Sequence, residues 1–513
     1  MLPIFAILAS LSPLTPIVPQ SADSVTPTNI EVSPSNLEKP LLIAKPPKKT
    51  TEQPPIEFKI PQTVKALPGE LDKVPVFNSN NPEIVRYSGI LLSTFPDKEM
   101  RFPNAHLDYG FKGRFDIFSH HIAKSDYPES TPTLYLGILV KNASRKKKNV
   151  IDVLQAASYL GTPDAPYISL APLIPNDVGR VFSGPGGRVS DVVLRGIRQT
   201  QWSPRLELEP DETVLLMNLP MPLPTLGSKP TSKDNTAGRL VKKKDNKGKP
   251  ATKTPSSNAR STLMRLKSKK EVYVASMAMF APIGSDGREK IPTLEDWQRL
   301  LERGNLVQPR DRAPSELNSK AEKFYYGRVA GVSQGSSWTT QVTDTPKKDY
   351  LSIPEKGDAI SYGIGTLQRG TYGTDQIQSA PMIVRYPDTA YLAHGNYGVH
   401  YQLTIPLKNK TKETNRVSLS FQTPIKARFK EDGLKFYKNP PKSVFFRGTV
   451  RLRYKNDFGT PQVRYFHLVQ KRGELSAPLA TVTLKPSESR LLKLDFVYPP
   501  DATPPQVITI KTE

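Results

Sequence analysis

The sequence predicts an all-β protein: two antiparallel β-sandwich lobes, immunoglobulin-like or jelly-roll-like, with one short connecting helix and disordered tails. After residue 83, apolar and polar residues alternate along many segments, which is the pattern of strands with one buried and one solvated face. Turns rich in Gly, Pro and Asn separate these segments, as is typical of antiparallel sandwiches. The chain has 513 residues, enough for several domains of roughly 150 residues each.

Composition narrows the function classes before any motif is considered. The chain contains no Cys, which excludes disulfides, thiolate zinc sites and cysteine nucleophiles. Its formal charge is +24. Apolar residues make up 37% of the chain, below the roughly 45–50% of an average soluble domain. This deficit indicates globular parts joined to segments that bury little.

The N-terminus has the features of an export signal. An apolar run over residues 2–14 is shorter than the roughly 20 residues of a membrane span. It fits the core of a signal peptide cleaved after Ala22, although no Lys or Arg precedes it. A buried N-terminal strand is the alternative, which the nearby prolines disfavour. We therefore expect an exported protein of the periplasm or cell surface, with residues 1–22 as signal peptide and residues 23–82 as a Pro-rich, disordered linker.

Regular alternation marks strands most clearly in the second half of the chain. Apolar residues occupy every second position in each of these runs, which predicts a half-buried strand. The runs lie at residues 401–407, 417–421, 450–454 and 492–498.

One helix is predicted between the two sandwiches. Thr293 is its N-cap, and Asp296 three residues later completes a capping box. Gly304 would end the helix in the left-handed conformation. The folded part is thus divided into a first sandwich at residues 83–282, a helical connector at 283–320 and a second sandwich at 321–513.

The two sandwiches share a weak internal repeat. Asn142 and Asn409 each follow one strand, and the next strand begins after the same interval. Further along each half, a polar turn containing Pro210 or Pro486 precedes an apolar strand. Two immunoglobulin-like sandwiches would explain the repeat. Chance similarity between hairpins that reuse the same turn residues is the alternative.

Residues 226–270 form a basic tract, which we expect to be a disordered insertion in the first sandwich. Such a tract attracts polyanions by counterion release, or it only keeps the chain soluble. Because no aromatic side chain lies within it to stack on bases, we expect acidic polysaccharide, cell wall or an anionic surface rather than specific nucleic-acid binding. The candidate polyanion-binding residues are Lys242, Lys243, Lys244, Lys247 and Lys249.

The stretch richest in polar and aromatic residues spans residues 370–401. Aromatic faces stack on sugar rings, and Asp, Asn and Arg side chains form hydrogen bonds with hydroxyl groups. The alternative is an ordered loop whose tyrosines pack on their own sandwich. The candidate ligand-binding residues are Tyr372, Asp375, Arg385, Asp388, Tyr391, His394, Asn396 and Tyr397.

Catalytic motifs are weak. Ser333 lies in a Gly-x-Ser-x-Gly match, but a nucleophile elbow needs a helix after the serine, and residues 336–340 suggest a turn and a strand. No metal-ligand spacing occurs among the six His, and the adjacent His120 and His121 would point to opposite faces of a strand. We therefore expect no enzyme activity, no catalytic residue, no metal site and no cofactor.

Several segments carry a resemblance to a known family. They are FVYPPDATPPQ at residues 496–506, APM at 380–382, RYPDTAY at 385–391 and HGNYG at 394–398. In these segments the chain resembles a cyanobacterial family of exported proteins known only as a domain of unknown function. The resemblance covers roughly residues 83–513. It implies a cell-envelope setting in a cyanobacterium and no catalytic residues.

Three functions stay open at this point. The leading hypothesis is an exported, non-enzymatic protein that binds or organises cell-envelope polymers, either acidic polysaccharide or peptidoglycan, through residues 370–401 and the basic tract. The second is a secreted hydrolase, carbohydrate-active or esterase-type, that uses Ser333 or carboxylates near Asp375 and Asp388. The third is an envelope assembly protein that binds another protein through an exposed sheet edge.

Overall fold

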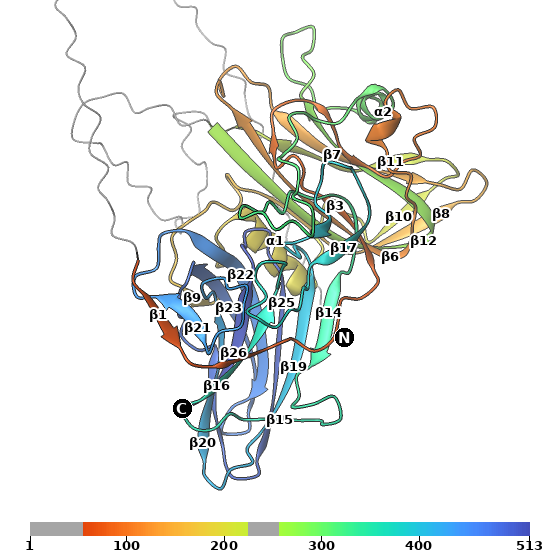
Figure 1. Ribbon diagram of the computed structural model, residues 1–513. Coiled ribbons are helices and arrows are strands. Elements are labelled where there is room, and N and C mark those ends of the chain that lie inside the picture. The colour runs from red at the N-terminus through yellow and green to blue at the C-terminus, as the bar shows by residue number, and fades with distance from the viewer. Residues whose placement is uncertain (1–54, 224–255) are drawn as a thin grey trace, which may run out of the picture. The chain divides into compact units, whose positions relative to one another are not determined.

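The strands of the chain form two lobes (Figure 1). The computed structural model describes residues 55–223 and 256–513. Strands dominate both described parts, so the all-β prediction is confirmed. The predicted signal peptide, most of the predicted linker and the candidate residues from Lys242 to Lys249 lie outside the described residues.

The first lobe is a single sheet of twelve strands. These are β3 (Pro75–Ser79), β4 (Ile84–Val85), β5 (Gly89–Ser93), β6 (Phe111–Ser125), β7 (Leu134–Asn142), β8 (Asn149–Leu160), β10 (Arg205–Leu208), β11 (Thr213–Met221), β12 (Ser256–Phe280), β13 (Ala330–Gln334), β17 (Ala380–Arg385) and β18 (Leu392–Ala393). The first half of β12 pairs with β6 and β8, and its second half pairs with β5 and β7. A register shift between Ser268 and Val272 separates the two halves. The sheet therefore folds over itself around one apolar core.

The second lobe is a sandwich of two sheets. The seven-stranded sheet contains β9 (Leu173–Pro175), β14 (Ser337–Gln341), β15 (Leu351–Ser352), β19 (His400–Lys408), β22 (Val444–Lys455), β23 (Pro461–Lys471) and β25 (Ser489–Val497). The five-stranded sheet contains β2 (Thr63–Lys65), β16 (Ala359–Ile364), β20 (Asn415–Gln422), β24 (Ala480–Leu484) and β26 (Gln506–Thr512). A separate pair joins β1 (Glu57–Ile60) to β21 (Leu434–Tyr437). The four predicted runs of alternation lie in β19, β20, β22 and β25, which confirms those strands.

The pairing is more mixed than predicted. Among the described residues, β2–β16, β3–β6, β4–β6, β14–β19 and β15–β19 are parallel pairs, and the other pairs between named strands are antiparallel. Alternation along one strand reports which face is buried, but it does not report the direction of the neighbouring strand.

The chain passes between the lobes more often than the predicted boundaries allow. The strands β13, β17 and β18 come from the predicted second sandwich but belong to the sheet of the first lobe, and β9 makes the reverse crossing. Residues 55–82, predicted as linker, supply β1, β2 and β3. Pro75 does not prevent β3 from pairing, because Pro is tolerated as the first residue of a strand.

The expected disordered insertion is wrong in its last part. Residues 256–270 are not disordered but form the first half of β12. Within this strand Met264 and Leu266 enter the apolar core, while Arg265 and Lys267 alternate with them. The basic character of the tract concealed this strand pattern.

The predicted helix forms as α2 (Leu294–Arg303), and its capping box is confirmed. The N–H of Asp296 donates to the Thr293 hydroxyl oxygen, and the N–H of Thr293 donates to the Asp296 carboxylate. The predicted left-handed end is wrong, because Gly304 has a φ of −86°. The helix does not connect the lobes but covers the outside of the first lobe (Figure 1). There Trp297 packs so closely on Gly137 that a Cβ at that position would lie 2.7 Å from the indole ring.

A second helix, α1 (Pro185–Leu194), lies between the lobes (Figure 1) and was not predicted. It packs on β8 and β12 of the first lobe and on β22 and β25 of the second. Its glycines and valines are weak helix formers, so the helix depends on this packing. Asp501 of the second lobe accepts a hydrogen bond from the N–H of Gly187 (2.9 Å) and thereby caps its N-terminus.

Neither of these helices is long and apolar enough to cross a membrane, and the same holds for the short 3₁₀ helix η1 (Pro103–Ala105) in the described part of the chain.

The internal repeat appears in the structure as the same hydrogen-bond pattern. Asn142 and Asn409 are fully buried at the ends of β7 and β19. Each amide donates to two backbone carbonyl oxygens, those of Lys147 and Glu209 for Asn142, and those of Glu413 and Leu484 for Asn409. Each asparagine thus ties a hairpin turn to a later part of the chain. The strand orders β10–β8–β12 and β24–β20–β26 also correspond.

We expect Asn142→Ala and Asn409→Ala to destabilise the protein by similar amounts, about 2–3 kcal/mol each, because each leaves buried carbonyl oxygens without donors. Chemical unfolding of the two variants measures this. Asn305→Ala, at an exposed asparagine, is the control and should cost less than about 1 kcal/mol. Unequal effects at the two buried positions would contradict the structural equivalence.

Candidate functional site

Both lobes line a cleft of about 260 Å³. This volume lies just below the roughly 300–1,000 Å³ of sites for drug-sized ligands, so it suits a small ligand or the end unit of a chain. Its polar lining residues come from β3 and the turn after it, from the segment before β13, from the turn after β18 and from the connection between β20 and β21. These residues are Asn78, Asn80, Tyr326, Arg328, His394, Asn396, Tyr397 and Lys426, and Thr503 joins them from the segment before β26.

Three of the lining side chains hold polar atoms that lack hydrogen-bond partners among the described residues. They are Oδ1 of Asn78, Oδ1 of Asn80 and Nδ1 of His394. The exposed fractions of these residues are 5%, 3% and 8%. A buried polar atom without a partner carries a desolvation cost of roughly 1–3 kcal/mol. A ligand that brings hydroxyl or amide groups into the cleft would remove that cost.

Two cations adjoin these groups. The guanidinium of Arg328 forms an ion pair with Glu83. Lys426 is an exposed residue overall, but its ammonium group donates to the Tyr326 hydroxyl at 2.8 Å. Desolvation of the ammonium group, with Arg369 nearby, lowers the pKa of Lys426 to about 8. At neutral pH the lysine is therefore mostly charged, and its charge can attract an anionic ligand.

An aromatic wall completes the cleft. The rings of Tyr326 and His394 meet edge to face, with centroids 4.7 Å apart. Burial lowers the pKa of His394 to about 4, so its imidazole is neutral at neutral pH. Burial raises the pKa of Tyr326 to about 12, so its hydroxyl keeps its proton. The wall therefore offers an aromatic surface with neutral hydrogen-bonding groups.

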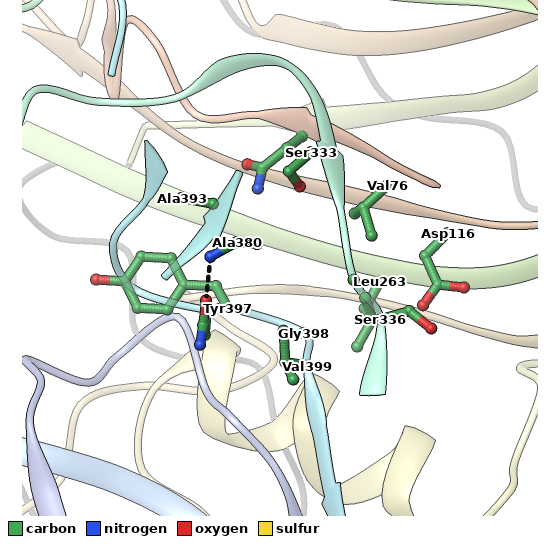
Figure 2. A pocket seen from close by; sticks show the side chains of 13 residues that line it. Val76, Asp116, Leu263, Ser333, Ser336, Ala380, Ala393, Tyr397, Gly398 and Val399 are labelled. Atoms are coloured by element: carbon green, nitrogen blue, oxygen red, sulfur yellow. Dashed lines mark hydrogen bonds between the residues drawn. The ribbon is translucent and has the colours of Figure 1, made fainter. Parts of the chain in front are cut away.

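Behind the cleft lies a much smaller cavity of about 10 Å³ (Figure 2). It shares Asn78, Asn396 and Tyr397 with the cleft and is closed by Asp116 and Ser333 from the first lobe. A hole of this size has room for about one water molecule. The shared residues make this cavity an extension of the floor of the cleft. Its volume excludes any larger ligand.

The structure brings three of the eight candidate ligand-binding residues to the cleft: His394, Asn396 and Tyr397. Asn396 is fully engaged, because its amide donates to the carbonyl oxygen of Gln378 and the hydroxyl of Tyr401, and its Oδ1 accepts from the N–H of Ala380. Asn396 therefore shapes the floor of the cleft rather than offering free groups.

The other five candidates lie outside the cleft, and four of them make structural contacts. Tyr372 is buried and donates to the carbonyl oxygen of Pro505, and Asp388 pairs with Arg310 at 3.0 Å. Arg385 donates to three backbone carbonyl oxygens of its own turn. Tyr391 donates to Glu316, and Asp375 is exposed outside the cleft. The segment is thus largely an ordered connection whose side chains hold it in place.

Sequence reasoning missed six of the nine polar lining residues; the six are Asn78, Asn80, Tyr326, Arg328, Lys426 and Thr503. They come from segments more than 300 residues apart, as Asn80 and Lys426 show. One signal was present: the asparagine-rich turn after Phe77 places Asn78, Asn80 and Asn81 in a short run. All three are buried, which is uncommon for asparagine.

The residues that suggest a hydrolase do not line the cleft. Ser333 lies within β13, and a strand rather than a helix follows it, so the nucleophile-elbow geometry does not form. Ser261 bonds to Nδ1 of His120 at 2.7 Å, and Nε2 of His120 lies 3.9 Å from Glu83. However, Ser261 is fully buried and lines neither of the two cavities described above. Within residues 55–223 and 256–513, no cluster of three His, Asp or Glu side chains could hold a metal ion.

A comparison with family models identifies the family of this two-lobed protein. The model described as a protein of unknown function, DUF3370, matches residues 62–512, and the chain belongs to this family. The match confirms the resemblance to a family of unknown function, whereas the cyanobacterial and exported setting stays a prediction. A search of the curated proteins found no match to the chain.

Proposed function

We propose that this protein is a non-enzymatic binder of cell-envelope polymer and that the cleft between its lobes holds a unit of acidic carbohydrate. The observation that carries the proposal is the set of buried, unpartnered acceptors beside Lys426. Sugar hydroxyls can donate to Asn78 and Asn80, and a uronic-acid carboxylate can pair with the ammonium group. The Lys426 ammonium group lies 4.7 Å from the centroid of the Tyr326 ring, so a bound uronic-acid unit would meet the cation and the aromatic ring together.

The setting that we propose is the periplasm or the cell surface. The short apolar run at the N-terminus supports it, because it fits a signal peptide. The net charge of +24 supports an anionic partner, because a strongly basic protein concentrates polyanions at its surface. Acidic polysaccharide and peptidoglycan both meet this description.

The test is binding of short oligosaccharides, since short chains limit non-specific attraction to the rest of a basic protein. We expect uronic-acid oligosaccharides to bind more tightly than neutral ones of the same length. Lys426→Gln should weaken binding about tenfold, which corresponds to about 1.4 kcal/mol. Isothermal titration calorimetry at fixed salt measures both effects.

Lys430→Gln is the matched control, because Lys430 is an exposed lysine nearby that does not line the cleft. The affinity of the Lys430→Gln variant for uronic-acid oligosaccharides should equal that of the unmodified protein. Equal weakening by both substitutions would indicate a diffuse charge effect and count against the cleft. Absence of binding to any envelope carbohydrate, including peptidoglycan fragments, would remove the proposal altogether.

A further inference from the structure

A hairpin tip on the second lobe displays an aromatic side chain to solvent. Phe458, in the turn between β22 and β23, is 93% exposed. The turn is well ordered, because Oδ1 of Asn456 accepts from the N–H groups of Phe458 (3.1 Å) and Thr460 (2.9 Å). The N–H of Asn456 also donates to the carbonyl oxygen of Thr460 across the turn. The ring is therefore held outward by the backbone and is not a side chain of a loose loop.

The sheet face beside this tip combines basic and apolar residues. In the strand register, Arg453 of β22 stands between Val463 of β23 and Lys493 of β25. The exposed fractions of Val463 and of Leu491, which lies on the same face of β25, are 55% and 47%. Lys455 lies on the same face next to the turn. We call Arg453, Lys455, Phe458, Val463, Leu491 and Lys493 the docking face.

Charge on the docking face is one-sided. Along the outward positions of β22, β23 and β25, all of which the structure describes, Asp495 is the only acidic residue, and its side chain is only 2% exposed. Arg453 and Lys493 are directly opposite each other, and like charges in that position destabilise a sheet. Arg453 is compensated in part by Asp495 at 3.4 Å, but among the described residues no carboxylate forms an ion pair with Lys493 or Lys455, so these two cations are available to an anionic partner.

We propose that the docking face binds the surface of an anionic lipid bilayer. The Phe458 ring, with Val463 and Leu491, would enter the boundary between headgroups and acyl chains, and the three cations would contact lipid phosphates. A hydrated polysaccharide would satisfy the cations but leave the apolar side chains in water. The combination therefore favours a bilayer over a soluble polyanion. The face is made of other residues than the carbohydrate cleft, so the two proposals stand independently.

The test places a reporter at the tip of the full chain. The natural tryptophans Trp202, Trp297 and Trp338 are buried, with exposed fractions of 6%, 0% and 4%. The fluorescence of Phe458→Trp is measured with vesicles of phosphatidylglycerol and brominated phosphatidylcholine, because bromine quenches only nearby indoles. Tyr127→Trp is the control, since Tyr127 is 75% exposed on the first lobe. We expect quenching at position 458 and none at position 127. With vesicles of brominated phosphatidylcholine alone, which lack the anionic lipid, quenching at position 458 should be lost.

Binding measurements extend the test. Phe458→Ser and Lys493→Gln should each lower affinity for the anionic vesicles about tenfold in co-sedimentation, and Tyr127→Ser should leave it unchanged. The proposal is overturned if the Phe458→Trp protein sediments with vesicles while the indole at position 458 is not quenched, because another segment then holds the membrane. It is also overturned if the protein ignores the vesicles, or if acidic polysaccharide alone shifts the emission of that indole.

Discussion

Lowering the pH from 7 to about 5 is expected to destabilise the fold by several kcal/mol. The physical cause is histidine burial. All six histidines of the chain lie in the described residues. Burial lowers the pKa of His120 to about 3 and the pKa values of four others to about 4, and it also lowers the pKa of His400. The four are His106, His121, His394 and His467.

The sign follows from proton linkage. Below a pH of about 6.5 the histidines of the unfolded chain take up protons, whereas His106, His120, His121, His394 and His467 stay neutral in the folded state until about pH 4. The stability is therefore complete above about pH 6.5 and falls as the pH decreases. At pH 5.5, each histidine with a folded pKa of about 4 costs roughly 1.4 kcal/mol. The summed cost of five such groups approaches the whole free energy of unfolding of a typical domain, which is roughly 5–15 kcal/mol.

Three carboxyl groups, one buried and two half-buried, act in the opposite direction. Burial raises the pKa values of Glu83, Asp116 and Asp501, so the folded state binds these protons more readily than the unfolded state does. Their contribution increases as the pH falls and offsets part of the histidine effect. For this reason we expect a net loss of several kcal/mol at pH 5 rather than the full sum.

Urea unfolding at a series of pH values from 8 to 5 measures the loss. Nuclear magnetic resonance of the histidine rings at pH 5.5 provides the independent check, since the folded protein should show neutral imidazoles. Stability that stays constant between pH 7 and pH 5, or rings that titrate near pH 6.5 in the folded state, would contradict the prediction.

Local sequence patterns predicted the parts of the fold that depend on neighbouring residues. The alternation from Tyr401 to Leu407 predicted β19, because one buried face imposes a period of two. Thr293 and Asp296 predicted the start of α2, because a capping box is complete within four residues. The matching turns at Asn142 and Asn409 predicted a structural repeat for the same reason.

Features that depend on distant contacts were not predictable in this way. Helix α1 contains two glycines in its first turn, and a Cβ at Gly186 would lie 2.6 Å from Pro500. The glycines therefore lower helix propensity and, at the same time, permit the close contact that stabilises the helix. Only the folded chain reveals that second role. The capping carboxylate, Asp501, is more than 300 residues away.

The sequence predicted only part of the candidate site, for a similar reason. Tyrosines, acids and arginines are abundant between residues 370 and 401, but composition does not show which of them are already bonded within the protein. Asp388 and Tyr391 are paired with Arg310 and Glu316, which precede β13. Free acceptors occur instead at Asn78 and Asn80. Whether a polar group is free depends on the distant segment that packs against it.

The second large effect concerns Asp495, whose carboxylate contacts two arginines and one histidine where the lobes meet. Its carboxylate accepts from Arg451 at 3.0 and 3.1 Å and lies 3.4 Å from both Arg453 and His400. His400 in turn lies 3.5 Å from Arg265 of the first lobe. Burial alone would raise the pKa of Asp495, but the hydrogen bonds from His400 and Arg451, together with the charges of Arg451 and Arg453, hold it below its usual value. The carboxylate therefore stays charged at neutral pH.

We expect Asp495→Ala to destabilise the protein by about 3 kcal/mol. Removing one partner of a buried ion pair costs roughly 3–5 kcal/mol, because the remaining charge loses its compensation. The lower end applies here, since the side chains of Arg451 and Arg453 are 22% and 43% exposed and recover some hydration. Asp495→Asn keeps hydrogen-bond acceptance without the charge, so its effect should be intermediate.

Urea unfolding at pH 8, where the histidines are neutral in both the folded and the unfolded states, isolates this effect from the acid instability. Asp432→Ala is the matched control, because Asp432 is 85% exposed in its ion pair with Lys59, and such surface pairs contribute roughly 0–1 kcal/mol. An Asp495→Ala loss as small as that of the control would mean that the cations are solvated independently. The contact through His400 and Arg265 would then contribute little to holding the lobes together.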